Sequence, residues 1–128
     1  MSEMTYAQAA RLGLQEEMRR DPRVWALGED LGYEGGMAGQ YSDLQAEFGE
    51  DRIVDTPISE STIMGAAVGA ALAGTRPIAE LRFSDFAMCA VDELVNQAAK
   101  ARYMFGGQAR VPMVARMPIG IRGGIAAQ

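Results

Sequence analysis

Histidine is absent from this chain, and cysteine occurs only once, at Cys89. Without histidine, the common zinc ligand sets and the Ser-His and Cys-His nucleophile pairs cannot form within the chain. A single cysteine excludes an internal disulfide and is typical of proteins from a reducing compartment. Metal binding by the acidic residues discussed below is therefore not expected.

Lysine is nearly absent too, since Lys100 is the only one, and the chain contains no GxxxxGK[ST] sequence. No GxGxxG sequence opens a helix after a strand either, so neither of the familiar phosphate-binding loops is present. We therefore expect that this domain does not hold a nucleotide or a diphosphate by itself.

Long apolar runs and clusters of positive charge are also missing. The longest apolar stretch, residues 63–74, is too short and too rich in glycine to cross a membrane. The first residues lack the basic and apolar regions of a signal peptide. A net charge of −5 argues against nucleic acid or an anionic membrane as a partner. We therefore expect a cytoplasmic protein with neither of these partners.

Short apolar runs alternate with helical patterns along the chain. We expect strands over residues 24–27, 52–54, 77–81 and 111–115, and helices over residues 6–20, 44–48, 60–74 and 87–104. Continuously apolar strands between helices are typical of a mostly parallel sheet covered on both faces. The sequence predicts one α/β domain of this kind, since 128 residues are enough for a single modest core.

Three helix starts carry recognisable capping residues. Thr5, with Gln8 three residues later, forms a capping box for the first helix. Ser59 is the expected N-cap of the third helix, which places Glu60 in its first turn, where the helix dipole favours a carboxylate. Asp85 is the expected cap of the last helix.

Carboxylates recur at the ends of the expected strands: Glu29, Asp30, Asp55, Glu60 and Asp85. Because the carboxyl ends of parallel strands share one edge of a sheet, we expect these acids to gather there. Partial burial and mutual repulsion would raise some of their pKa values, which keeps a carboxyl available as a proton donor. Glu60 is the predicted functional centre. Glu29 and Asp30 have a second interpretation, as solvated turn residues.

Two further patterns are open to two interpretations each. Phe83 and Phe86 could form a stacking surface for a flat ring or belong to the core. Gly65, Gly69 and Ala73 place small residues on one helix face. That face could receive another subunit, or it could pack closely on the sheet of this chain.

Several segments together resemble one family: residues 28–30, 55–60, 65–77, 83–86, 96–107 and 126–128. They resemble the beta subunit of the thiamine-diphosphate-dependent first component of 2-oxo acid dehydrogenase complexes. Pyruvate, branched-chain and acetoin dehydrogenases share this subunit type. The resemblance covers nearly the whole chain and corresponds to the N-terminal pyrimidine-binding domain of that subunit.

The resemblance implies roles for individual residues. In the family, the glutamate of the Thr-Pro-Ile-Ser-Glu motif contacts N1′ of the aminopyrimidine of the cofactor and promotes loss of the proton from thiazolium C2. That glutamate corresponds to Glu60, which would be the catalytic residue. Ile58 and Phe86 would line the same pocket. Arg82 and Cys89 also fall at pocket positions, although the family has other residues there.

Further expectations follow from the resemblance. Glu29 would belong to an acidic tunnel between paired active sites, and the Met113 backbone would match a potassium-coordinating carbonyl of some members. An alpha subunit would hold magnesium and the diphosphate in an α2β2 assembly, and a lipoyl-bearing acyltransferase would receive the acyl group from a 2-oxo acid or acetoin. In the family, a histidine follows the motif matched by Ala126–Gln128, so we expect the pyrimidine-binding domain over residues 1–128 to be incomplete at its C-terminal end.

Two other functions remain open from the sequence. The chain could belong to another transketolase-like thiamine-diphosphate enzyme, in which one chain also carries the diphosphate domain. It could also be a non-catalytic assembly module that supplies only a helical interface through Gly65 and Gly69.

Overall fold

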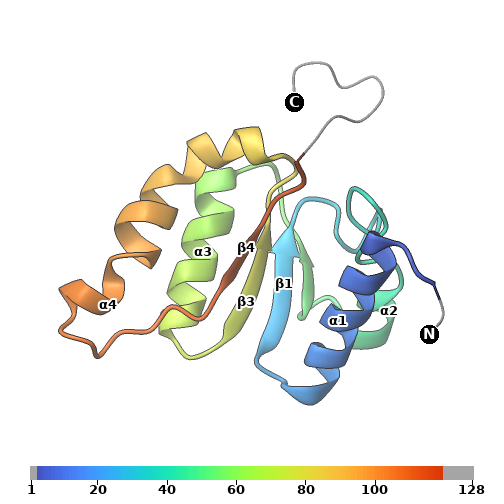
Figure 1. Ribbon diagram of the computed structural model, residues 1–128, viewed down its shortest axis with the longest axis horizontal. Helices are drawn as coiled ribbons and strands as arrows, with labels where there is room; N and C mark the ends of the chain where they lie inside the picture. Colours follow the sequence, from blue (N-terminus) through green and yellow to red (C-terminus); the bar gives the residue numbers. More distant parts are fainter. Residues whose placement is uncertain (1–2, 120–128) are drawn as a thin grey trace.

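The computed structural model describes residues 3–119, which form a four-stranded sheet with helices on both sides (Figure 1). The strands are β1 (Val24–Gly28), β2 (Ile53–Asp55), β3 (Arg76–Glu80) and β4 (Val114–Arg116). The helices are α1 (Tyr6–Arg20), α2 (Leu44–Phe48), α3 (Glu60–Leu72), the 3-10 helix η1 (Ser84–Ala90), the π-helix η2 (Asp92–Ala98) and α4 (Ala101–Met104).

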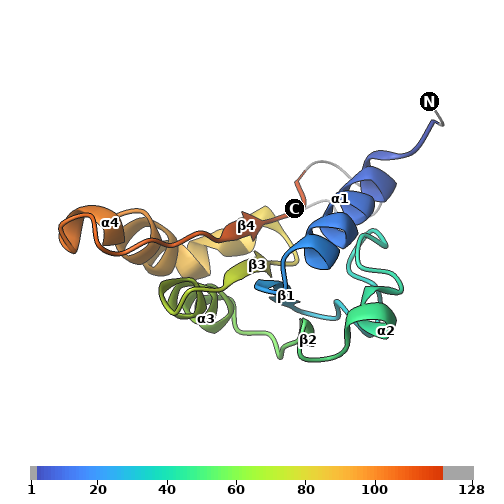
Figure 2. The same cartoon turned by 90° about the horizontal axis from the view of Figure 1, so that it is seen from below.

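All three strand pairs are parallel, and the strand order is β2-β1-β3-β4. Figure 2 shows the strands in this order, with α3 on one side of the sheet and α1 on the other. Parallel neighbours need long crossover connections, which the helices provide. The predicted α/β fold class is confirmed, with strand ends that differ by at most three residues from the expected ones.

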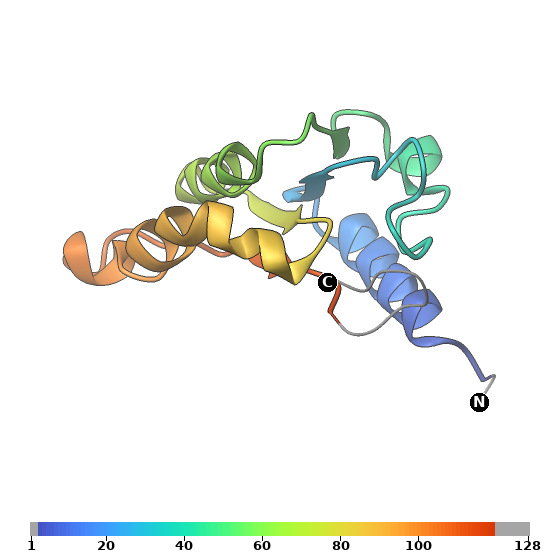
Figure 3. The same ribbon diagram turned by 90° about the horizontal axis from the view of Figure 1, so that it is seen from above.

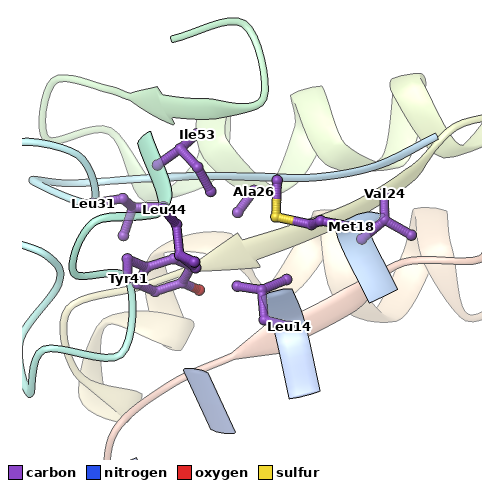
Figure 4. Packing of buried hydrophobic residues seen from close by; sticks show 8 residues of the cluster. All are labelled: Leu14, Met18, Val24, Ala26, Leu31, Tyr41, Leu44 and Ile53. Atoms are coloured by element: carbon purple, nitrogen blue, oxygen red, sulfur yellow. The ribbon is translucent and has the colours of Figure 1, made fainter. Parts of the chain in front are cut away.

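The side chains of β1 alternate between the two faces of the sheet, as the pleat of a strand requires. Val24 and Ala26 point toward α1, where they pack against Leu14 and Met18 (Figure 4). This first core cluster also contains Leu31, Tyr41, Leu44 and Ile53. It joins α1, α2 and the loop after β1 to one face of the sheet.

A second core cluster lies on the opposite face, beneath α3. Leu27 and Ala79, which are register partners on β1 and β3, pack there against Ile63 and Met64. The buried residues of α3 also include Ala67, Val68 and Ala71. The start of α3 is thus fixed against the two central strands, which sets where Glu60 can lie.

The first helix begins as the capping box predicts. The Thr5 amide donates to Oε1 of Gln8 at 2.8 Å, and the Gln8 amide donates to Oγ1 of Thr5 at 3.2 Å. The helix ends at Arg20, immediately before Asp21 and Pro22, because proline cannot continue it.

The segment from residue 84 to 104 differs from the prediction of a single α-helix capped by Asp85. The segment winds beside α3 as η1, η2 and α4 (Figure 3). Phe83 occupies the N-cap position, and Asp85 lies inside η1. In η2, Asp92 accepts hydrogen bonds from Asn96 at 2.8 Å and Gln97 at 3.2 Å. Acceptance from both positions suits the wider π-helical turn, which sequence spacing alone does not specify.

Several apolar side chains of that segment are exposed. Met88, Val91 and Val95 are 78%, 40% and 50% exposed, whereas Leu94 packs against the second core cluster. Regular spacing identifies a helix face but not what covers it. Within the described part of the chain, no helix has the length and apolar character needed to cross a membrane.

Candidate active site

The four strands end in line at one edge of the sheet. Gly28 on β1 is in register with Asp55 on β2 and with Glu80 on β3, and Glu80 is in register with Arg116 on β4. A β-carbon added to Gly28 would lie 2.7 Å from the carbonyl oxygen of Glu80, so only glycine fits at the centre of this row. The row brings charged side chains from three strands to the carboxyl edge of the sheet.

Glu60 lies at this edge as the first residue of α3, and its side chain is partly buried. The loop before it crosses from the end of β2, where the Thr56 amide donates to the Gly28 carbonyl at 2.9 Å. Ile58 is 79% exposed in that loop. The predicted location of Glu60 at the start of a helix beside the strand ends agrees with the structure.

Ser59 occupies the predicted N-cap position of α3, but its side chain does not cap the helix. Its hydroxyl donates instead to the carbonyl of Pro57 at 3.1 Å. Its own carbonyl accepts the first helical hydrogen bond, from the Ile63 amide, at 2.9 Å. The predicted N-cap position is therefore correct, but the side chain is turned toward Pro57 and accepts no hydrogen bond from the amides of the first turn.

Glu29 follows β1 at the same edge and is partly buried. Burial raises the pKa of its carboxyl above the ordinary value, and the negative charges of Glu60 and Asp30 raise it further, while the Arg82 guanidinium lowers it. Its Oε1 atom is buried without a hydrogen-bond partner. Glu29 is thus partly buried with an unpartnered oxygen, so a solvated turn residue is not an adequate description of it.

Arg82, just after β3, connects to the loop that follows β1. Its Nη2 donates to Oε2 of Glu34 at 2.9 Å, and its Nη1 lies 3.3 Å from Oδ2 of Asp30. The hydrogen bond to Glu34 is the main reason why the pKa of the guanidinium is raised. Arg82 is therefore near the predicted site, with its charge engaged by two carboxylates of this chain.

A buried polar cluster at the same edge was missed by the sequence interpretation. The Glu80 side chain is 4% exposed, and its Oε2 lies 3.4 Å from Nε of Arg116. Its Oε1 accepts a hydrogen bond from Nε2 of Gln40 at 3.0 Å. The hydroxyl of buried Tyr41 lies beside this carboxyl, although neither it nor Oε2 of Glu80 forms a hydrogen bond of normal geometry. A charged residue inside the otherwise apolar run of residues 77–81 was the available signal.

Burial dominates the electrostatics of this cluster. It raises the pKa of Glu80 despite the opposing effects of the Tyr41 hydroxyl and the Arg116 guanidinium. Burial likewise raises the pKa of the Tyr41 hydroxyl.

Among residues 3–119, all buried polar side-chain atoms that lack a hydrogen-bond partner lie at this edge of the sheet. They belong to Glu29, Tyr41, Thr56, Glu80 and Arg82. Such atoms are rare in folded proteins and are often found where a ligand or a reaction uses them. Their gathering at the carboxyl edge marks it as the candidate site of this domain.

The remaining predicted residues lie in different places. Phe83 and Phe86 form an edge-to-face pair with ring centroids 5.6 Å apart, and Phe86 is partly buried in η1. Cys89 is exposed in the same helix. Met113 precedes β4, and therefore lies at the opposite end of that strand from Arg116. Among the described residues, no group of three or more histidine, cysteine, aspartate or glutamate side chains could hold a metal ion.

The small-residue face of α3 is open in this chain. A β-carbon added to Gly69 would meet nothing within 4 Å, and one added to Gly65 would meet only the Glu93 side chain, at 3.6 Å. Of the two interpretations of this face, close packing on the sheet of the same chain is therefore not what the structure shows.

The chain matches a family described as transketolase, pyrimidine binding domain, over residues 2–128. An all-parallel α/β sheet with charged groups at its carboxyl edge agrees with that description. The chain belongs to the transketolase pyrimidine-binding domain family.

Individual relatives within this family are beta subunits of 2-oxo acid dehydrogenases. The chain is 48% identical to the 2-oxoisovalerate dehydrogenase subunit beta of Bacillus subtilis (strain 168) over 120 residues, 94% of this chain and 37% of the relative. It is 44% identical to the mitochondrial pyruvate dehydrogenase E1 component subunit beta of Bos taurus over 126 residues, 98% of this chain and 35% of the relative. It is 46% identical to the pyruvate dehydrogenase E1 component subunit beta of Rickettsia bellii (strain RML369-C) over 126 residues, 98% of this chain and 39% of the relative.

The resemblance to E1 beta subunits inferred from the sequence motifs is thus confirmed. The chain spans little more than a third of the length of these curated relatives.

Proposed function

We propose that this domain is the pyrimidine-binding part of a thiamine-diphosphate-dependent 2-oxo acid dehydrogenase or acetoin dehydrogenase. The observation that carries this proposal is the gathering of buried, unpartnered polar atoms at the carboxyl edge of the sheet, where Glu29 and Glu60 also lie. The names of the relatives support a 2-oxo acid as substrate, since they refer to 2-oxoisovalerate and pyruvate. Because those relatives are longer, the proposal concerns the assembled enzyme.

The residues at the edge fit an aminopyrimidine ring. Such a ring has an edge that forms hydrogen bonds and two apolar faces. The partly buried Glu60 carboxyl offers a partner for the ring edge, and the exposed Ile58 side chain two residues earlier offers an apolar surface. Phe86, partly buried beside Phe83, offers an aromatic one. The unpartnered Oε1 of Glu29 keeps a further polar atom available in the same place.

Thiamine diphosphate, when bound, supplies a carbon nucleophile and takes up the electrons released when the bond to the carboxylate of a 2-oxo acid breaks. Glu60 would hold N1′ of the aminopyrimidine and exchange a proton at that atom. Glu29 would line an acidic tunnel toward a second, paired active site. Ile58 and Phe86 would exclude water from the ring. Arg82 would act at the same pocket.

Partners follow from the same proposal. The term subunit beta in the names of the relatives supports an alpha subunit in an α2β2 assembly, which would hold magnesium and the diphosphate. A lipoyl-bearing acyltransferase would receive the acyl group. A potassium ion at the Met113 carbonyl remains a prediction. We also propose a cytoplasmic location, with which the free thiol of Cys89 is compatible.

The test is the Glu60→Gln variant of the full-length subunit, assembled with its alpha partner. We expect turnover of pyruvate or 2-oxoisovalerate to fall by a factor of about 10² to 10⁴, the range of a lost acid–base group, while assembly persists. Glu50→Gln, at an exposed turn residue, is the matched control and should leave turnover unchanged. Full turnover by Glu60→Gln would contradict the catalytic role.

Two alternatives give other results. A transketolase-like synthase would transfer a two-carbon unit to an aldehyde rather than an acyl group to a lipoyl acceptor. A non-catalytic assembly module, which the open face at Gly69 favours, would assemble normally and show no dependence of turnover on Glu60.

A further inference from the structure

Arg82 ties together two loops that are far apart in sequence. It follows β3, whereas its partners Asp30 and Glu34 belong to the loop after β1. The Arg82 side chain is 26% exposed, while those of Asp30 and Glu34 are 47% and 49% exposed. The guanidinium is therefore the more buried member of both pairs.

The two partners of Arg82 lie at the ends of one tight turn. Asp30 has a φ of 53°, a left-handed conformation that is uncommon for residues other than glycine. Its carbonyl accepts hydrogen bonds from the amides of Glu34 at 3.1 Å and Gly36 at 3.0 Å. Asp55 holds the same turn from β2, since its carboxylate accepts from the amides of Gly32 at 2.7 Å and Tyr33 at 3.1 Å.

Glu29 immediately precedes this turn, so the turn determines where its carboxyl lies. The charged groups that act on Glu29 are Glu60 from α3, Asp30 from its own loop and Arg82 from the end of β3. Arg82 is the cation among them. Its charge also reaches the Glu80 carboxyl on β3. One guanidinium thus both holds the turn and opposes the repulsion between the acids.

We propose that Arg82 is a positioning residue that, by pairing with Asp30 and Glu34, holds the turn after β1 and, with it, the Glu29 carboxyl that precedes the turn. This inference rests on the proposed function, because it assigns Arg82 an action through Glu29 rather than direct contact with the aminopyrimidine. Arginine suits this position because its planar fork can bind two carboxylates at once, whereas lysine presents a point charge.

The first experiment measures the loop without the cofactor. In the cofactor-free assembled protein, amide hydrogen exchange of the peptide covering residues 29–36 should become about tenfold faster in Arg82→Gln, as expected for loss of a charge-assisted hydrogen bond. In Arg82→Lys, which keeps the charge, the exchange rate should lie between those of Arg82→Gln and the unchanged protein. Arg102→Gln, at an exposed residue of α4, is the control and should match the unchanged protein.

The second experiment measures the pH dependence of kcat/KM in the loaded assembly with pyruvate or 2-oxoisovalerate. Loss of the cation in Arg82→Gln should move the acid limb to higher pH by about half to one unit. Arg82→Lys should restore most of this shift.

A third variant should move the acid limb in the opposite direction. Glu34→Gln removes the negative charge of one of the two carboxylates paired with Arg82 and leaves the Asp30 pair and the cation in place, so the acid limb should move to lower pH. Because Glu34 lies on the surface, this variant also provides the test if Arg82→Gln does not fold.

Unchanged exchange in Arg82→Gln would overturn the proposal. So would faster exchange with an unmoved acid limb, because that combination describes an ordinary structural tie. A shift in the same direction for Arg82→Gln and Glu34→Gln would also overturn it. Full turnover by Glu60→Gln would refute the proposed function instead, and the exchange experiment would then decide the role of Arg82 in holding the turn.

Discussion

Glu80 and Arg116 are register partners at the ends of β3 and β4, and their side chains form an ion pair with 3.4 Å between Oε2 and Nε. The pair links the last described strand to the centre of the sheet. Glu80 also accepts the hydrogen bond from Gln40, so the pair holds the glycine-rich loop after β1 as well. The carboxyl edge is thus built around a buried charge.

Removing this carboxyl should reveal how much of its effect is hydrogen bonding and how much is charge. Glu80→Ala leaves Gln40 and Arg116 without an acceptor and should lower the free energy of unfolding by about 2–4 kcal/mol. Glu80→Gln keeps an acceptor for Gln40 and avoids burying a charge, so it should cost less than about 1 kcal/mol. Urea denaturation of both variants provides the comparison. Equal losses in the two variants would contradict this division.

The unchanged protein and Glu80→Gln should differ in how their free energy of unfolding depends on pH. The pKa of Glu80 is raised in the folded state, so its favourable contribution is complete below the unfolded value, about 4.3, and is lost as pH rises through the folded value. Relative to Glu80→Gln, the unchanged protein should therefore lose stability over that rise and then level off. Urea denaturation at a series of pH values measures the difference. A constant difference would mean that Glu80 titrates normally.

Two glycines should respond in opposite ways to alanine. Gly28→Ala would press a β-carbon against the Glu80 backbone, at 2.7 Å, and should cost about 1–3 kcal/mol. Gly13→Ala, inside α1, meets nothing within 4 Å and should stabilise the protein by about 0.5–1 kcal/mol because alanine favours a helix. Thermal denaturation of the two variants should show melting temperatures on either side of the parent value.

Arg52 should be important for joining α1 to the sheet. Its Nη2 donates to the carbonyls of Met18 at 2.9 Å and Asp21 at 3.1 Å, and its guanidinium lies 5.2 Å from the ring centroid of Phe48. Arg52→Met keeps the apolar stem but removes the guanidinium donor from both carbonyls, of which that of Asp21 keeps its bond from the Val24 amide at 3.1 Å, so we expect a loss of about 2–3 kcal/mol. Arg52→Lys should recover part of it. Chemical denaturation measures both, and a neutral Arg52→Met would show that water replaces the guanidinium.

Local sequence signals predicted the local structure well. Thr5 and Gln8 identified the start of α1 to the residue because a capping box involves only neighbouring amides. Continuous apolar runs located all four strands and gave the parallel α/β class. The break of the segment 84–104 into η1, η2 and α4 was not predicted, because each piece spans at most about two turns, too few for apolar spacing to distinguish α, 3-10 and π geometry.

The site was predicted in part. Placing Glu29 and Glu60 at one edge required only the rule that parallel strands end together, and the structure agrees. Their chemical roles remain predictions. The contact of Glu80 with Gln40 joins residues 40 positions apart, and no short motif encodes such a partner. The open face at Gly69 likewise depends on what packs against α3, which a sequence pattern does not specify.

The aligned row of Asp55, Gly28, Glu80 and Arg116 determines where the length of this protein can change during evolution. One residue inserted within β1 would exchange its two faces, turning Trp25 and Leu27 toward α1, and would move Gly28 out of line with its neighbours. The exposed segment from residue 105 to 108, after α4, is bound neither by this alternation nor by the contacts that fix the loop after β1. We therefore expect insertions and deletions among homologues to fall in that segment, and the strands to keep their lengths.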